Sequence, residues 1–412
     1  MQKKCNKKKI VFATGDNTMR LLGDFAPQER NMISRLPRDF AIINLEGPVF
    51  HHRPSEELKK QKAGSHIYNT YQSDLDYQFV YCLANNHIMD FGVPGLDSTF
   101  NYINSQESAS LGAGYNINEA IRSLNISYSD AKFGIIARTE KQFGIAGFNK
   151  PGTAPFEPSL YIQIQKLKST VDFVIVSLHG GSEIYPWPSP QRQITCRSLI
   201  EAGADIVHGH HAHVPQGWEE YKGGLIFYGL GNFCVDPEKW SWHPNGLWSL
   251  APVISLRGGR IVMRPETTVI EDHGQSIAVR ASTQEETLRH HEYLRICNKP
   301  LTNPVLLEGL WQEASIRMYH EYYADWLGFN SSPSKAFLRS VRKAISQIKR
   351  TVIGKTNSLD TVRSQYLLRY HLFACDSHND AISTALGLLG GELDDLRTEE
   401  TADLVNKWVI HR

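Results

Sequence analysis

Short apolar runs alternate with turn-rich or helical stretches up to about residue 275, and this alternation most constrains how the chain can fold. Runs rich in Val, Ile and Phe are typical of buried strands. The predicted strands are Ile10–Ala13, Phe40–Asn44, Phe79–Leu83, Phe133–Ala137, Phe143–Gly147, Val171–Leu178, Asp205–His208 and Leu225–Leu230. Helices are predicted between them at Pro94–Ser105, where proline suits a first helical turn, and at Gln191–Ala204. Strands that alternate with helices indicate an α/β layered sheet.

Two later segments have different patterns. The apolar runs Leu250–Leu256 and Arg260–Ile270 are joined through a Gly-Gly pair, which predicts an antiparallel hairpin. After about residue 280 the periodicity is helical, and no further strand is expected. The predicted helices there are Thr287–Ile296, Leu310–Trp326, Ser334–Ile353, Leu359–Phe373, Asp380–Leu389 and Thr398–Trp408. We therefore predict an α/β domain over residues 1–280 and a helical C-terminal region over residues 281–412.

Side chains that can bind metal follow five of the predicted strands. They are Asp16, Glu46, Asn86, His179, and the pair His211 and His213. In open α/β sheets, ligands bind outside the carboxyl ends of strands, so these residues are expected to meet at one edge. Each has a simpler explanation by itself, as a helix cap, a turn residue or a core histidine. Their common position after strands favours a shared site.

The last of these segments is the richest in potential ligands, with four histidines in the six positions from His208 to His213. In an extended turn His211 and His213 would share a face, because side chains two apart point the same way. Carboxylate, amide and imidazole ligands together suit Mn, Fe, Zn or Mg. Six ligands exceed the needs of one tetrahedral zinc, and one or two divalent ions are expected.

Composition excludes several classes of protein. The formal net charge is +1 with 21% charged residues, so no basic excess indicates nucleic acid as a partner. The six cysteines have no C-x-x-C spacing, which argues against a disulfide framework and favours a reducing compartment. The apolar run Ile10–Ala13 is too short for a signal-peptide core or a membrane span. A cytoplasmic protein is expected, with peripheral membrane association left open.

Two segments allow more than one interpretation. The predicted helix near residues 335–353 is basic and has an apolar stripe, so it could dock on an anionic membrane surface or a synthase partner, or simply pack on the core. Residues 50–75 are polar and turn-like, and could form a substrate loop or a plain surface insertion.

Several motifs together resemble those of the bacterial CapA family, the capsule and poly-γ-glutamate synthesis proteins of the metallophosphatase superfamily. The resemblance covers about residues 9–270 and leaves out the helical C-terminal region. The matching segments are Gly15-Asp16, Asn44-Leu45-Glu46, Leu83-Ala84-Asn85-Asn86-His87 with Asp90 and Gly92, Gly112-Ala113-Gly114, Glu119-Ala120, His179-x-Gly181-x-Glu183 with Tyr185, Gly209-His210-His211-x-His213, Gln216, and Tyr228-x-Leu230-Gly231-Asn232-Phe233.

The resemblance implies a four-layer α-β-β-α sandwich with a site at its strand ends. Asp16 would hold the first metal, Glu46 would bridge, and His213 would complete the first site. Asn86, His179 and His211 would hold the second metal. His87 would be the catalytic proton donor to the leaving group, or would stabilise charge on the phosphate. Further motif residues are expected to contact substrate: Asn85, Glu183, Tyr185, His210 and Asn232. Thr18 stands where ordinary metallophosphatases carry a histidine, so the first metal site would lack a nitrogen ligand.

These residues lead to a functional hypothesis, a metal-dependent hydrolase of phosphoester-type bonds that acts on a phosphorylated or polymer-precursor substrate in cell-surface polymer synthesis. The alternative is a non-hydrolytic accessory protein that supports a polymer synthase or exporter at the membrane. Hydrolysis or transfer at an amide bond is a third possibility, because two-metal sites also serve peptidases.

Overall fold

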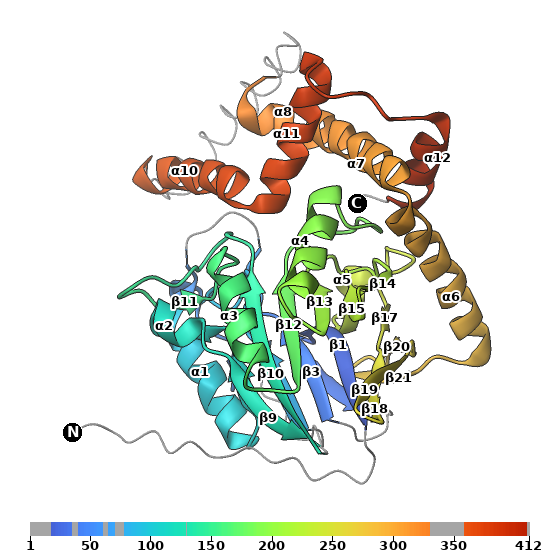
Figure 1. The fold of residues 1–412 in the computed structure, drawn as a ribbon. Coiled ribbons are helices and arrows are strands. Elements are labelled where there is room, and N and C mark those ends of the chain that lie inside the picture. Colours follow the sequence, from blue (N-terminus) through green and yellow to red (C-terminus); the bar gives the residue numbers. More distant parts are fainter. Residues whose placement is uncertain are drawn as a thin grey trace.

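A computed structural model describes residues 18–34, 40–60, 65–70, 78–128, 130–329 and 358–409. They form a mixed α/β structure with several sheets in its first part and helices in its last part (Figure 1). The predicted strand Ile10–Ala13 and the predicted basic helix at 335–353 lie outside the described residues. Within those residues, no helix is long and apolar enough to cross a membrane.

The first large sheet has the strand order β19-β18-β1-β3-β6-β7, and β16 also pairs with β1. Strands β1, β3, β6, β7 and β16 are parallel, and β18 and β19 form an antiparallel hairpin at one side. The bounds are β1 Thr18–Ala26, β3 Phe40–Leu45, β6 Gln78–Cys82, β7 Ala109–Leu111, β16 Asn232–Val235, β18 Val253–Arg257 and β19 Arg260–Arg264. The hairpin predicted from the Gly-Gly pair is confirmed, with Arg257 opposite Arg260.

The second large sheet has the order β14-β15-β13-β12-β10-β9. Its four inner strands are parallel, and β9 and β14 are antiparallel strands at its two edges. The bounds are β9 Leu124–Tyr128, β10 Ala131–Thr139, β12 Phe173–His179, β13 Ile206–His210, β14 Trp218–Tyr221 and β15 Gly224–Phe227. Strands β17 (Trp248–Leu250), β20 (Thr267–Asp272), β21 (Ser276–Ala281) and β2 (Asn31–Ser34) make a smaller third sheet.

Alternate residues of the strands enter different hydrophobic clusters, because successive side chains point to opposite faces of a sheet. One cluster contains Leu21 and Ile42 of the first sheet together with Phe133 and Ile175 of the second. A second cluster joins the first sheet to helix α1 (Gly92–Ser105). A third joins the second sheet to helices α3 (Ser159–Lys168) and α4 (Pro190–Glu201). The central strands such as β3, β12 and β13 are therefore covered on both faces, which explains why their runs are continuously apolar.

The last part of the chain is helical, as its periodicity predicts. Asn303 caps α7, and capping boxes start α6 and α12. The helices are α6 (Gln284–Asn298), α7 (Pro304–Met318), α8 (Ala324–Leu327), α10 (Ser358–Ala374), α11 (Asp376–Gly390) and α12 (Glu399–Trp408). Trp311 of α7 and Val405 of α12 belong to the same apolar cluster as the two large sheets, so this region packs on the core. Figure 1 shows α7, α10 and α11 at one end of the molecule, where α4 begins.

Most of the predicted strands within the described residues are present, with bounds shifted by one to three residues. The predicted strand Phe143–Gly147 is wrong, because this segment bends and makes only isolated bridges, from Ile145 to Thr153 and from Gly147 to Lys150. Its Gly144 has a φ of +70°, which an L-residue in a strand does not adopt. The polar segment at 50–75 contains the short helix Glu56–Leu58 and the strand β5 (Asn69–Thr70), which pairs with β4 (Val49–Phe50).

Candidate metal centre

Polar side chains from both large sheets meet at the carboxyl ends of their parallel strands. The residues are Asp24 in β1, Glu46 after β3, Asn86 after β6, His179 at the end of β12, and His211 and His213 after β13. All six side chains are buried. Five of them were predicted from the sequence; Asp24 was not.

Two groups of these residues could each hold an ion. Asp24, Glu46 and His213 form the first group, and Glu46, His179 and His211 form the second. In each group one ligand atom from every residue lies within 4.8 Å of the others. Glu46 belongs to both groups, so its carboxylate is placed to bridge two ions.

Neighbouring amides orient the first group. The Asn44 side-chain amide donates to Oδ1 of Asp24 at 2.7 Å, and Nδ1 of His213 lies 2.9 Å from Oδ1 of Asn232. Nδ1 of His213 is 3.7 Å from Oδ2 of Asp24, and its Nε2 is 3.7 Å from Oε1 of Glu46. Burial alone would lower the pKa of His213, but the two carboxylates outweigh burial and raise it to about 9. The first group therefore combines two anionic oxygens with an imidazole that they attract.

The second group contains imidazoles that favour the neutral form. Burial and the neighbouring histidines lower the pKa of His179, and burial lowers that of His211 to about 4. Nε2 of His179 lies 2.9 Å from Oδ1 of Asn86. The buried Nδ1 atoms of His179 and His211 have no hydrogen-bond partner among the residues that the structure describes. Buried polar atoms are normally satisfied, and a divalent ion would satisfy donor atoms of this kind.

The turn that carries the two histidines is not extended, contrary to the prediction. His211 has a φ of +91° and His213 a φ of +57°, both in the left-handed region. Such conformations cost on the order of 1–3 kcal/mol each and cluster at functional sites. The turn sends the two imidazoles into different groups, whereas an extended segment would place them on one face.

His87 faces the shared carboxylate from a third direction. Its Nδ1 lies 2.8 Å from Oδ2 of Asp90, and its Nε2 is 3.9 Å from Oε1 of Glu46. The Ile67 backbone N–H also donates to Oδ2 of Asp90, at 2.7 Å, and so helps to fix this carboxylate. A carboxylate on one ring nitrogen sets the tautomer and leaves the other nitrogen to act toward the centre. When both ring nitrogens carry a proton, His87 could donate from Nε2 toward the candidate centre while Nδ1–H stays bonded to Asp90.

Two glycines allow the strands to approach each other closely beneath the centre. A Cβ added to Gly23 would lie 1.9 Å from the carbonyl oxygen of Gly231, and one added to Gly209 would lie 1.9 Å from that of Tyr228. Both contacts are with backbone, which cannot move aside locally. These positions therefore require glycine directly before Asp24 and before His210.

The predicted first ligand, Asp16, lies outside the described residues. The aspartate of the first group among the described residues is Asp24, which belongs to a second Gly-Asp pair eight residues later. The sequence signal for it is weak, because the segment Met19–Leu22 before that pair is interrupted by Arg20; this segment is part of β1. Counted from Asp24, the position where ordinary metallophosphatases carry a histidine is Ala26, so the first group again lacks that nitrogen ligand.

The residues predicted to contact substrate have different environments. Glu183 is exposed, and its Oε1 lies 3.7 Å from Nε2 of His211. Asn232 orients His213, and His210 is buried with Nδ1 3.8 Å from Oδ1 of Asp24. Tyr185 packs between Trp187 and Trp311. Asn85 holds the loop before His87, with its amide donating to Leu45 O and its Oδ1 accepting from Ile88 N–H. Of these five residues, Glu183 is the exposed one, so a ligand could reach it directly. The role of all five in substrate binding stays a prediction.

A cavity of about 370 Å³ adjoins the second group. Asn86 and Gln142 line it, and the amide nitrogen of Gln142 lies 3.4 Å from Nε2 of His211. Three basic residues also line it, from three separate segments: Lys60, Lys150 and Arg363. Asp90 lines the cavity as well, so basic side chains outnumber acidic ones there, although the whole chain is nearly neutral.

These observations define an α/β protein with a nitrogen- and oxygen-lined candidate metal centre at its strand ends. The family model "Bacterial capsule synthesis protein PGA_cap" matches residues 22–237, just over half of the chain. The chain therefore belongs to this family, as the CapA motifs predicted. The match begins at Leu22, so it includes Asp24.

Curated relatives match over the same part. "PGA biosynthesis protein CapA" of Bacillus subtilis (strain 168) is 33% identical over 208 residues, 48% of this chain and 53% of that protein. "Capsule biosynthesis protein CapA" of Bacillus anthracis is 31% identical over 211 residues, 48% of this chain and 51% of that protein. A "Probable polyglutamine synthesis accessory protein" of Mycobacterium tuberculosis is 29% identical over 222 residues, 50% of this chain and 58% of that protein. The chain thus spans about half the length of the curated relatives it matches.

Similarity to solved structures is low. A hypothetical protein from Thermus thermophilus aligns with a TM-score of 0.35 and 13% identity, covering 61% of this chain and 98% of that one. A 5'-nucleotidase from Candida albicans aligns with a TM-score of 0.30 and 10% identity, covering 55% and 44%. Both scores are too low to support an argument about shared architecture or chemistry.

Proposed function

We propose that the protein is a metal-dependent hydrolase of the metallophosphoesterase type that acts in the synthesis of a capsule or another cell-surface polymer. The observation that carries this proposal is the buried Glu46 carboxylate, which belongs to both candidate metal groups and faces His87. Two ions sharing one carboxylate can clamp the attacking and leaving oxygens of an in-line displacement. The role in polymer synthesis comes from the family and from the printed names of the relatives.

The layer arrangement supports the proposal. The four-layer α-β-β-α sandwich expected for a metallophosphatase requires two facing sheets with helices on both outer faces. One apolar cluster contains residues of both large sheets, and two further clusters join each sheet to its own helices, α1 on one and α3 and α4 on the other. We also propose that this sandwich occupies residues 1–280 and that residues 281–412 form a helical C-terminal region that packs on it.

Each residue of the centre has its own proposed role in hydrolysis. Asp24 and His213 would hold one ion, His179, His211 and Asn86 the other, and Glu46 both. The bound ions would supply a hydroxide nucleophile at neutral pH and neutralise charge on phosphorus. His87 would give its Nε2 proton to the leaving oxygen, and Asp90 at Nδ1 would hold the imidazole in the required orientation. Mn, Fe, Zn and Mg all suit this mixed nitrogen and oxygen set.

The basic cavity supports an anionic substrate. Lys60, Lys150 and Arg363 line an opening that reaches Asn86, so an extended phosphorylated or carboxylate-rich precursor could place its reacting group at the ions. Arg recognises phosphate and carboxylate through paired hydrogen bonds, and Lys does so as a point charge. A phosphorylated polymer precursor has the negative charge that suits the basic residues of the cavity and the phosphoester that suits the metal centre.

The direct test is hydrolysis of an aryl phosphate and an aryl phosphodiester with added Mn²⁺. His87→Asn should lower kcat by roughly 100-fold or more, because it removes the proton donor while leaving the ligands in place. The exposed His291→Asn in α6 serves as the matched control and should retain activity. Equal activity in the wild type and His87→Asn would contradict the assigned role. Absence of metal-stimulated turnover on every substrate would contradict the hydrolase.

A non-hydrolytic accessory function is the second candidate, and one structural observation favours it. Ala26 offers no nitrogen ligand, so the first group has only Asp24, Glu46 and His213. One relative is itself named a synthesis accessory protein. In this case the protein would bind metal and precursor without turnover and dock on a membrane or synthase through residues 335–353. Co-sedimentation with anionic vesicles at low salt, lost when Arg339, Arg342 and Lys343 are neutralised, is the expected result for membrane docking.

A further inference from the structure

A second cluster of metal-binding side chains lies outside the strand-end centre, at the corner between α10 and α11. His371 is in the last turn of α10, Cys375 lies between the two helices, and His378 is in the first turn of α11. Cys375 has extended backbone angles, φ −78° and ψ 122°, so the chain changes direction there. The change of direction brings Nε2 of His378 to 2.9 Å from Nε2 of His371.

The donor atoms have the spacing of a zinc site. One donor atom each from His371, Cys375 and His378 lies within 4.8 Å of the other two. A tetrahedral zinc ion with ordinary bond lengths separates two nitrogens by about 3.3 Å, and a nitrogen and a sulfur by about 3.6 Å. Small side-chain movements would bring these three donors to such distances. Cys375 is buried and the two histidines are half-buried, so an ion there would be partly shielded from water.

The surroundings hold the imidazoles in place. The hydroxyl of Tyr323 lies 2.6 Å from Nδ1 of His378, which leaves Nε2 to face the cluster. Histidines that bind metal almost always donate their other ring N–H to a neighbouring group, which fixes the tautomer and the ring plane. The His371 ring stacks on Phe143 with ring centroids 4.5 Å apart. Both rings are thus oriented by residues outside the corner.

We propose that His371, Cys375 and His378 bind one zinc ion and that this ion fixes the corner between α10 and α11. Thiolate and imidazole ligands select zinc, whereas the strand-end centre offers carboxylates, an amide and imidazoles. Three protein ligands leave the fourth position to water or to an incoming ligand.

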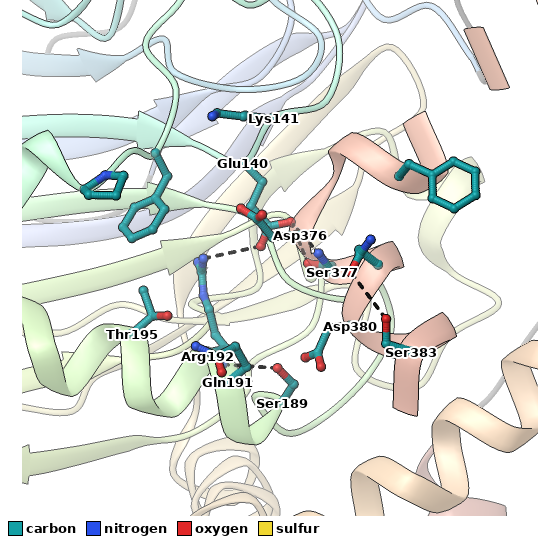
Figure 2. Close-up of a pocket in the computed structure, with 14 residues that line it drawn as sticks. Glu140, Lys141, Ser189, Gln191, Arg192, Thr195, Asp376, Ser377, Asp380 and Ser383 are labelled. Carbon is teal, nitrogen blue, oxygen red and sulfur yellow. Dashed lines mark hydrogen bonds and ion pairs between the residues drawn. The ribbon is translucent and has the colours of Figure 1, made fainter. Parts of the chain in front are cut away.

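The corner contacts the loop that lines the strand-end centre. Glu140 accepts hydrogen bonds from the Ser377 backbone N–H at 3.2 Å and from its hydroxyl at 2.6 Å. The Gly181 backbone N–H donates to the other oxygen of Glu140 at 2.9 Å. Figure 2 shows Glu140 and Ser377 pointing toward each other. Both line a cavity of about 640 Å³, and Arg192 of α4 also lines it. An ion at the corner would therefore stabilise the wall shared by this cavity and the centre.

Cobalt is the most direct probe, because a thiolate bound to Co²⁺ gives a near-ultraviolet charge-transfer band that carboxylate and imidazole ligands do not. Metal-free, reduced full-length protein is titrated with Co²⁺ and then with Zn²⁺. The band should saturate at one equivalent of thiolate-bound cobalt per chain and disappear when zinc displaces it. Cys375→Ser should abolish the band, and His378→Asn should weaken cobalt binding at the corner by roughly 10-fold or more.

Two controls separate this site from the strand-end centre. Cys196→Ala removes another buried cysteine, in the apolar cluster beneath α4, and should keep the band. Asp24→Asn should also keep it, because that residue belongs to the other centre. The proposal is overturned if the folded wild type gives no thiolate band, or if the band persists in Cys375→Ser. If Cys375→Ser does not fold, an unchanged band in His378→Asn overturns it instead. Each result is independent of hydrolase activity.

Discussion

Replacing Asp24 with Asn should weaken the first metal group and leave the second in place. The Asp24 carboxylate is fully buried and forms that group with Glu46 and His213. Asparagine has nearly the same shape, and its amide oxygen can still accept from Asn44, so the change is mainly the loss of one negative charge. The matched control is Asp16→Asn, which changes the aspartate of the first Gly-Asp pair.

The expected magnitude follows from the position of Asp24 as a direct ligand. Loss of an outer-shell partner lowers metal affinity roughly 10–100-fold, so loss of an anionic ligand should lower it at least about 100-fold, or about 2.8 kcal/mol. With metal at about 100 times the wild-type Kd, the ion stabilises the folded wild type by about 2.7 kcal/mol and the variant by about 0.4 kcal/mol. Without metal, Asp24→Asn should be at least as stable as the wild type, because a buried carboxylate carries a desolvation cost.

The assay is denaturant unfolding of wild type, Asp24→Asn and Asp16→Asn, each with and without Mn²⁺, together with metal analysis after dialysis. The free energy of unfolding with metal should fall by about 2.3 kcal/mol in Asp24→Asn and stay unchanged in Asp16→Asn. The reasoning is refuted if Asp16→Asn loses metal while Asp24→Asn binds it as the wild type does.

Three further perturbations have expected outcomes. Glu46→Gln should lower the binding of both ions, since this carboxylate belongs to both groups, and metal analysis should show less metal than in Asp24→Asn. Gly209→Ala should destabilise the protein by about 3 kcal/mol in denaturant unfolding, because its Cβ would meet backbone at 1.9 Å, whereas Gly390→Ala, with open space around it, should be tolerated. The hydrogen bonds from Arg280 lower the pKa of Glu286 from 4.5 to about 2. Glu286→Gln should therefore lower the free energy of unfolding by about 1 kcal/mol at pH 7. The difference in this free energy between wild type and variant should shrink as the pH falls from about 4.5 toward 2. A difference that stays constant with pH would contradict this assignment.

Much of the fold follows from local pattern. Runs such as Phe40–Asn44 and Val171–Leu178 are covered on both faces in the structure, so continuous apolar character predicted them as strands. The segment Phe143–Gly147 has similar composition but is not a strand, because Gly144 has a positive φ and the segment lies in the loop beside His371. Composition alone does not distinguish a strand from an apolar segment that packs on another part of the chain.

The candidate site, like the fold, could be predicted from the sequence only in part. The order and spacing of Glu46, Asn86, His179, His211 and His213 predicted the family and also five residues that the fold brings together. The sequence contains two Gly-Asp pairs, and both follow apolar residues. The register of β1 against β3 places Asp24 opposite Asn44, whereas Asp16 lies outside the described residues.

The sequence by itself determined which side chains are available and in which order the strand ends present them, because strand periodicity and turn residues act over a few positions. Only the tertiary structure showed that Asp24 lies beside Glu46, that His211 and His213 belong to different groups, and that the α10–α11 corner contacts Glu140. Those outcomes depend on contacts between segments tens to hundreds of residues apart. Such contacts are selected by packing and close backbone approach in the folded chain, and no local pattern encodes them.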